Sequence, residues 1–164
     1  MSPRCPTTAE RSRQMSLVRG KGNKSTEQRL ATLLRANHIT GWRRHLALPG
    51  RPDFAFPAPY KVAVFIDGCF WHRCPSCQRR LPRSNAAFWA EKIASNVRRD
   101  RRANRQLRAK GWTVVRIWEH ALKNERAAEL RVRRALKKCI DTFGESDAVP
   151  QSQTALRRSA HLRP

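Results

Sequence analysis

Acidic residues are scarce in this chain of 164 residues: 12 Asp and Glu stand against 35 Lys and Arg, for a formal net charge of +23. Such an excess must be neutralised by a polyanion or tolerated as self-repulsion. Most of the basic residues are arginines, whose planar guanidinium group suits phosphates and guanine edges. The composition favours nucleic acid as the partner over an anionic membrane surface, because no long amphipathic helix with an apolar face is visible.

Long apolar runs are also missing. No run of about eighteen apolar residues exists to span a bilayer, and the first residues lack the apolar core of a signal peptide. The five cysteines are odd in number and clustered, which favours metal binding over disulfides and predicts a reducing cytoplasm. No internal repeat or heptad pattern is present, so nothing argues against a monomer.

The chain is long enough for one domain, and 40% of its residues are hydrophobic. Composition predicts a flexible basic arm over residues 1–24, a folded domain over 25–143 and a disordered tail over 144–164. Inside the domain, hydrophobic periodicity predicts the element order α-β-β-β-α-β-α, a mixed α/β sheet between helices. The expected strands are 42–48, 53–56, 61–66 and 112–118, and the expected helices begin near residues 25, 85 and 124.

Helix ends and inward faces are predicted from the same patterns. Ser25 and Gln28 resemble a capping box, and Asn85 is a candidate cap for the second helix. The last helix is expected to turn Leu130, Leu136 and Ile140 inward. Four tryptophans are assigned to the core: Trp42, Trp89, Trp112 and Trp118.

Three cysteines, Cys69, Cys74 and Cys77, lie on one short segment. Close spacing lets a single loop wrap a tetrahedral ion, so the pattern predicts a structural zinc site with a fourth ligand from elsewhere. His120 is the preferred fourth ligand, because the strand before it would end beside the strand before Cys69 if the two strands pair. The weaker alternatives are His38, His45 and Cys139, and the simplest alternative is three free thiols.

A second set of residues has the chemistry of a hydrolytic site. Asp53 opens a strand, Asp67 follows the Ile66 carbonyl at the end of another strand, and His72 lies close behind. Hard oxygen ligands converging from several elements suit Mg²⁺ ions that assist phosphodiester cleavage, and His72 suits general acid–base catalysis. Two of these residues also have a simpler interpretation: Asp53 could be a turn residue, and His72 could be a zinc ligand in place of His120. Two further acids, Glu27 in the first helix and Asp100 in the second, are either part of this site or partners of the helix dipole and of nearby arginines.

Three ordered segments carry a family resemblance: Pro49-Gly50-Arg51-Pro52-Asp53-Phe54, Asp67-Gly68-Cys69-Phe70-Trp71-His72, and a helical pattern from Phe88 to Asp100. Together they closely resemble the very short patch repair (Vsr) DNA mismatch endonuclease family. Residues 15–21 and 118–119 also match the pattern, so the resemblance covers residues 10 to 140 and makes 25–143 an endonuclease domain.

The resemblance implies a restriction-endonuclease-like fold of the PD-(D/E)XK type and a strand-specific nick at a T:G mismatch left by 5-methylcytosine deamination. It implies that Asp53 and the Ile66 carbonyl ligate Mg²⁺, that His72 is catalytic, and that Glu27 and Asp100 hold metal-bound waters. The zinc set would be Cys69, Cys74, Cys77 and His120.

The resemblance further implies that Phe70 and Trp71 wedge into double-stranded DNA beside the mismatch, with Met15 entering from the arm, where Arg19 and Lys21 also contact DNA. It implies a bacterial, nucleoid-associated enzyme that works near mismatch-repair proteins and a DNA cytosine methyltransferase. Apolar wedges are physically reasonable because a mismatch unstacks at low cost.

Two features depart from related nucleases. Phe65-Ile66-Asp67 replaces the acid-x-Lys of the wider superfamily, so no catalytic lysine is expected there. Asp67 stands where the family's best-known member has a histidine, and it could ligate metal, orient His72 or hydrogen-bond a metal-bound water. The competing functions are a restriction-type endonuclease with another DNA target and a non-catalytic zinc-knuckle DNA-binding protein.

Overall fold

The computed structural model describes residues 24–83 and 85–146. Its centre is a four-stranded sheet in the order β1-β2-β3-β4, in which β1, β2 and β3 pair antiparallel and β4 pairs parallel to β3. The predicted mixed sheet and element order are confirmed. The strands are β1 (Arg43–Arg44), β2 (Phe54–Phe56), β3 (Val62–Asp67) and β4 (Thr113–Trp118).

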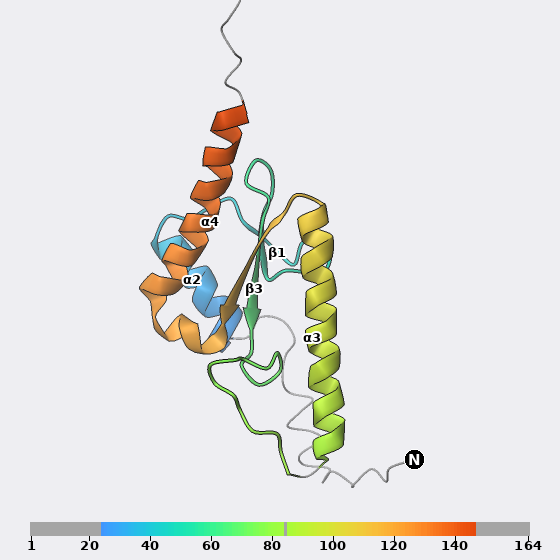
Figure 1. Ribbon diagram of the computed structural model, residues 1–164. Helices are drawn as coiled ribbons and strands as arrows, with labels where there is room; N and C mark the ends of the chain where they lie inside the picture. Colours follow the sequence, from blue (N-terminus) through green and yellow to red (C-terminus); the bar gives the residue numbers. More distant parts are fainter. Residues whose placement is uncertain (1–23, 84, 147–164) are drawn as a thin grey trace, which may run out of the picture.

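Helices cover both faces of the sheet (Figure 1). The long α3 (Ala86–Ala109) lies along one face, while α2 (Arg29–Ala36) and α4 (Glu125–Ser146) lie on the other. Short helical turns precede α2 and α4, namely the π-helical η1 (Lys24–Gln28) and the 3-10 helix η2 (Glu119–Lys123). The result is a sheet buried between two helical layers.

The residues of β3 divide the core in two. Side chains alternate between the faces of a strand, so Val62 and Val64 join the larger core beneath α2 and α4. Ala63 and Phe65 face α3, where they meet Leu107 in a smaller cluster. Because both faces are covered, β3 is an almost continuous apolar run, as expected for a central strand.

Several local predictions are wrong for identifiable reasons. The expected strand over 42–48 shrinks to β1, because His45 takes a positive φ of 51° that an extended strand does not allow. Helical winding begins at Lys24, one residue before the Ser25 start that the capping box predicted. Asn85 precedes α3 in the left-handed conformation with no side-chain cap hydrogen bond.

The inward face of α4 also differs from the prediction. Leu136 packs against the larger core as expected, but Ile140 is 53% exposed. Among the described side chains of this helix, the buried ones are Ala128, Glu129 and Val132, and the last turns of α4 extend past the sheet (Figure 1). The predicted arm (1–24) and tail (144–164) lie outside the described residues, except that Lys24 belongs to η1 and residues 144–146 continue α4, where a tail was expected.

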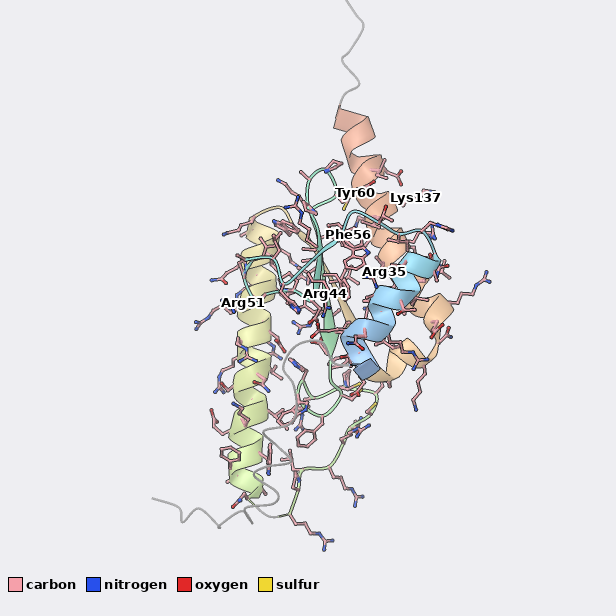
Figure 2. The ribbon with its side chains drawn as sticks, turned by 180° about the vertical axis from the view of Figure 1, so that it is seen from behind. Arg35, Arg44, Arg51, Phe56, Tyr60 and Lys137 are labelled. Carbon is pink, nitrogen blue, oxygen red and sulfur yellow. The ribbon has the colours of Figure 1, made fainter. Side chains whose placement is uncertain are left out.

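Parallel pairing of β3 and β4 places their carboxyl ends at one edge of the sheet, in the register Asp67 opposite Trp118. The loop after β3 and η2 after β4 therefore emerge at the same end of the sheet, as predicted, with the loop toward the N-terminal half of α3 and η2 toward α4 (Figure 1). Tyr60 and Lys137 lie at the other end of the molecule (Figure 2). None of the helices in the described ranges is long and apolar enough to cross a membrane.

We expect Gly50→Ala to lower the free energy of unfolding by about 2–4 kcal/mol. Gly50 has a φ of 76°, and an added Cβ would lie 2.7 Å from the Ala103 Cβ and 3.2 Å from the Phe65 ring. Gly111→Ala is the matched control, because Gly111 has a φ of 75° with nothing within 4 Å. Urea denaturation should show a smaller loss for the control, and equal losses would contradict the close approach at Gly50.

Candidate functional site

Three thiols and one imidazole converge at the carboxyl edge of the sheet. Cys69, Cys74 and Cys77 lie on the loop after β3, and His120 lies in η2 after β4. Their Sγ atoms stand 3.2, 3.6 and 3.3 Å from His120 Nδ1, and all four potential ligand atoms lie within 4.8 Å of one another. Tetrahedral zinc with ordinary bond lengths separates sulfur from nitrogen by about 3.6 Å, so this donor set fits a tetrahedral cation.

The electrostatics of these thiols also suit a cation. Burial, together with the neighbouring Cys69 and Cys74, raises the pKa of Cys77 to about 11, since crowded thiolates repel one another. Burial also disfavours the Cys74 thiolate, but the backbone N–H groups of Cys77 and Ser76 point at its sulfur and lower its pKa overall. A bound cation would relieve this repulsion.

A second cluster lies on the α3 side of the same edge. His72 Nδ1 is 2.6 Å from Asp100 Oδ2 and 3.6 Å from Asp67 Oδ1. Arg116 from β4 donates to both Asp67 oxygens at 2.6 Å, and its Nη2 is 3.2 Å from Asp100. Asp67, His72 and Asp100, predicted as site residues, are thus brought together.

Arg116 is a member of this cluster that sequence reasoning missed. It alternates with apolar residues in β4, and that alternation is the signal that could have placed it on the same face of the sheet as Asp67. Although burial lowers the pKa of Arg116, its bonds to Asp67 raise it overall. Burial likewise raises the pKa of Asp100, but the hydrogen bond from His72 lowers it, so the ionised carboxylate is favoured.

The third cluster contains Glu27, His45 and Asp53. The buried Glu27 carboxylate accepts from Arg44 and lies 3.3 Å from His45 Nε2. Arg44 lies near the centre of the molecule (Figure 2). His45 was considered only as a zinc ligand from sequence, and the structure instead places it beside these acids, where its left-handed backbone breaks the expected strand.

Burial raises the pKa of Asp53 to about 6, with the nearby charges of Glu27 and Asp67 adding to the effect. The Ile66 backbone N–H opposes this shift by donating to Asp53 Oδ2 at 2.7 Å. The charges of Glu27 and Asp67 both act on Asp53. The cluster of Glu27, His45 and Asp53 therefore lies next to the cluster of Asp67, His72 and Asp100. A carboxylate with these surroundings would be stabilised by a cation.

Pro52 offers no backbone donor to the Ile66 carbonyl. Phe54 pairs with Val64, so the same antiparallel register brings Pro52 opposite Ile66. The N–H and C=O of one residue point toward the same neighbouring strand in such a ladder, and the Ile66 N–H already points to Asp53. Pro52 has no N–H to offer, so the Ile66 carbonyl faces the Asp53 side without that backbone donor.

Four aromatic residues gather beside this edge: Phe70, Trp71, Phe88 and Trp89. The rings of Phe70 and Trp71 meet edge to face at 5.2 Å, and Trp89 lies 5.7 and 5.8 Å from them. Phe88 contacts Trp89 at 5.4 Å and is 54% exposed. The loop is a series of turns rather than a strand, which lets the rings of Phe70 and Trp71 meet although the two residues are adjacent in the chain.

The assignment of tryptophans to the core holds only in part. Trp42 and Trp112 pack against the two apolar clusters, whereas Trp89 belongs to the half-exposed aromatic group. Asn96 of α3 fixes this group by donating to the Trp71 carbonyl at 3.0 Å. An aromatic group anchored by a buried amide is a surface suited to stacking.

The alternative zinc ligands from sequence are not assembled by the fold. Cys139 lies 3.5 Å from the Thr113 hydroxyl instead, and neither it nor His38 joins any of the candidate metal groups among the described residues. His72 pairs with Asp100 rather than with the thiols. Met15, Arg19 and Lys21, expected to contact DNA, lie outside the described residues.

The sequence matches the family model described as DNA mismatch endonuclease Vsr over residues 5–79. It is 38% identical over 147 residues to the type II nicking enzyme V.NaeI of Lentzea aerocolonigenes, covering 85% of this chain and 86% of that protein. It is also 38% identical over 115 residues to the DNA mismatch endonuclease Vsr of Escherichia coli, covering 70% of this chain and 72% of that protein.

Fold, site and these similarities define an α/β endonuclease that acts on DNA. The chain belongs to the Vsr family of DNA mismatch endonucleases. The resemblance seen in the sequence is thereby confirmed, and the non-catalytic zinc-knuckle alternative is set aside.

We expect Asp53→Asn to change how stability depends on pH when no divalent metal is added. Because folding raises the Asp53 pKa from 3.8 to about 6, the folded state binds the proton more tightly, and its stability falls as pH rises between these values. The penalty is complete above about pH 6 and absent below about pH 4. Urea denaturation should show that the free energy of unfolding of the variant rises relative to that of the wild type as the pH is raised through this window. If this difference between variant and wild type instead falls with pH, the burial of the carboxylate is contradicted.

Proposed function

We propose that this enzyme nicks one strand of double-stranded DNA at T:G mismatches that arise from 5-methylcytosine deamination, in a reaction that requires Mg²⁺. The observation that carries the proposal is the convergence of Asp53, the Ile66 carbonyl edge and the His72–Asp100 pair at one end of the sheet. In this proposal the fold is a variant of the PD-(D/E)XK type, and Asp67 stands at the position where the acid-x-Lys motif of the superfamily has its lysine.

Asp53 and the Ile66 carbonyl would hold Mg²⁺, since both are hard oxygen donors facing the same strand edge. The raised pKa of Asp53 is the signature of a carboxylate that gains from a nearby cation. When bound, the ion supplies charge stabilisation to the phosphate and activates water. Glu27 and Asp100 would hold water molecules bound to the ion and would not bind the ion directly, because each already has a basic partner.

His72 is oriented for proton transfer by Asp100. Asp100 accepts a hydrogen bond at 2.6 Å from Nδ1, which fixes the proton on that nitrogen and leaves Nε2 as the functional atom. Nε2 would take a proton from the attacking water, so His72 acts as the general base. Hydrolysis would leave 5′-phosphate and 3′-hydroxyl ends.

The donor set Cys69, Cys74, Cys77 and His120 would hold a structural Zn²⁺. All four positions of a tetrahedral ion are filled by the protein, so no open site is left for substrate. The ion would fasten the loop after β3 to η2 after β4. That fastening sets the position of His72, which lies between two of the thiol ligands in sequence.

Phe70 and Trp71 would enter the duplex beside the mismatch, supported from behind by Trp89. Phe88, exposed and in contact with Trp89, extends the same aromatic surface and was not predicted as a DNA contact. Stacking of bases on such rings contributes about 1–3 kcal/mol per base. In this proposal Met15, Arg19 and Lys21 complete the contact from the arm.

A second candidate is a nicking enzyme tied to a different DNA target. Relatives of comparable identity carry the name type II nicking enzyme, including V.NaeI and V.XorIIP of Xanthomonas oryzae. The catalytic geometry would be the same, and only the target would change. As part of the mismatch proposal, we place the enzyme in the bacterial cytoplasm as a monomer that works beside mismatch-repair proteins and a DNA cytosine methyltransferase.

We expect the protein to nick a T:G duplex in the presence of Mg²⁺ and to leave matched T:A and C:G duplexes intact. Asp53→Ala and His72→Ala should abolish nicking while binding of the T:G duplex persists, because the substitutions remove the ion ligand and the base but not the basic surface. Denaturing gels and mobility shifts provide the two readouts. Nicking without regard to the mismatch would favour the second candidate, and nicking by both variants would rule out these catalytic roles.

We expect the purified protein to contain about one zinc ion per chain. Cys74→Ser should lower the zinc content and the melting temperature together, because metal binding to such a site is coupled to folding. Cys139→Ser is the matched control, since Cys139 contacts Thr113 away from the cluster. Elemental analysis and thermal unfolding provide the measurements, and an unchanged zinc content in the Cys74 variant would contradict the site.

A further inference from the structure

One side chain, Arg116, joins the three elements that build the acidic edge on the α3 side. It projects from β4, donates from Nε and Nη2 to both oxygens of Asp67 on β3, and reaches Asp100 on α3. Its Nη1 donates to Asn104 Oδ1 at 3.2 Å, four residues after Asp100 on the same helix. All three guanidinium nitrogens are therefore engaged.

The guanidinium plane is also fixed by packing. It lies 4.9 Å from the centre of the Phe65 ring, and Phe65 is the residue opposite Arg116 in the parallel register. A stacked and forked guanidinium has little conformational freedom left. The Arg116 side chain is therefore restrained by contacts with both β3 and α3.

These contacts limit what Asp67 can do. Both of its oxygens accept 2.6 Å hydrogen bonds from Arg116, and the residue is only 2% exposed. Its 3.6 Å separation from His72 Nδ1 is longer than a hydrogen bond, whereas Asp100 is within 2.6 Å of that atom. Asp67 is therefore engaged by Arg116 and is poorly placed to serve as a ligand or a base.

Arg116 in turn determines where Asp100 can sit. Nη2 contacts Asp67 Oδ1 and Asp100 Oδ1, while the other oxygen of Asp100 accepts from His72. Without the guanidinium, two carboxylates would face one another at a half-buried edge with one imidazole between them. The position of Asp100, and with it the orientation of His72, depends on that positive charge.

We propose that Arg116 is a positioning residue for catalysis, and that Asp67 acts only through Arg116 by holding its guanidinium against Asp100. The chain of contacts Asp67–Arg116–Asp100–His72 fixes the proton on His72 Nδ1 and presents Nε2 to the DNA. This inference rests on the proposed general-base role of His72, and it assigns to Asp67 a role that the sequence left open.

The test is a double-mutant cycle of Arg116→Gln, Asp67→Asn and the combined variant, measured by single-strand nicking of the T:G duplex. We expect Arg116→Gln to lower kcat about 10- to 100-fold with little change in KM. If Asp67 acts only through Arg116, the combined variant should be no slower than Arg116→Gln alone. Arg116→Lys should recover only part of the rate, because an ammonium group cannot form the fork.

A second readout does not depend on activity. Long-range ¹H–¹⁵N spectra of histidine-labelled protein report which ring nitrogen of His72 carries the proton, with His72→Ala supplying the assignment. We expect the Nδ1–H tautomer in the wild type and a loss of that preference in Arg116→Gln. A failure of the wild type to nick mismatched DNA would sink the proposed function, while these spectra would still test the positioning role.

Arg133→Gln is the matched control, because Arg133 also forms an ion pair, with Glu129 on α4, but does not touch the cluster. It should leave kcat and the His72 spectrum unchanged. If Arg116→Gln does not fold, the same cycle is run with Arg116→Lys, which keeps the charge. The proposal is overturned if the single-variant losses multiply in the combined variant, if kcat matches the control, or if the His72 tautomer does not change.

Discussion

The parallel pairing of β3 with β4 is the constraint on which the rest of the structure depends. It places Asp67 opposite Trp118 and Phe65 opposite Arg116, so two segments about fifty residues apart in the chain end at the same edge. The thiol loop follows one strand and His120 follows the other. Shifting this register by one residue would turn Arg116 to the other face and separate it from Asp67.

Acidic residues are few in this chain, and the fold concentrates them. Four of the 12 acids, Glu27, Asp53, Asp67 and Asp100, belong to the two adjoining clusters at the carboxyl edge. Glu27, Asp67 and Asp100 each pair with an arginine or a histidine, whereas Asp53 accepts from the Ile66 N–H. Burial, with the charges of Glu27 and Asp67, raises the pKa of Asp53 to about 6 against the opposing effects of the Ile66 N–H and of Arg44. In the proposed function, Asp53 is therefore the carboxylate that gains most from a cation.

Much of this architecture could be predicted from the sequence, because it is encoded in local patterns. The apolar run before Asp67, the thiol spacing and the Pro52-Asp53 turn each indicate their element without knowledge of the fold. Arg116 was missed, because the alternation in β4 indicates only its face of the sheet, and its partner Asp67 comes from a strand register that joins residues 49 positions apart. His45 was misassigned for a related reason: its left-handed backbone turns it toward Glu27, and no periodicity predicts that turn.

The thiol cluster and the cluster of Asp67, His72 and Asp100 are joined through one loop. His72 lies between Cys69 and Cys74, and the Cys74 N–H donates to the Cys69 carbonyl at 2.9 Å, so the same tight turn sets the thiols and the imidazole. On the opposite side, Asn96 holds the Trp71 carbonyl and Asp100 holds His72, both from the same helix. The loop is therefore clamped between η2 and α3. A change in either clamp would displace the imidazole and the aromatic pair together, which in the proposed function would couple the contact with DNA to the geometry of cleavage.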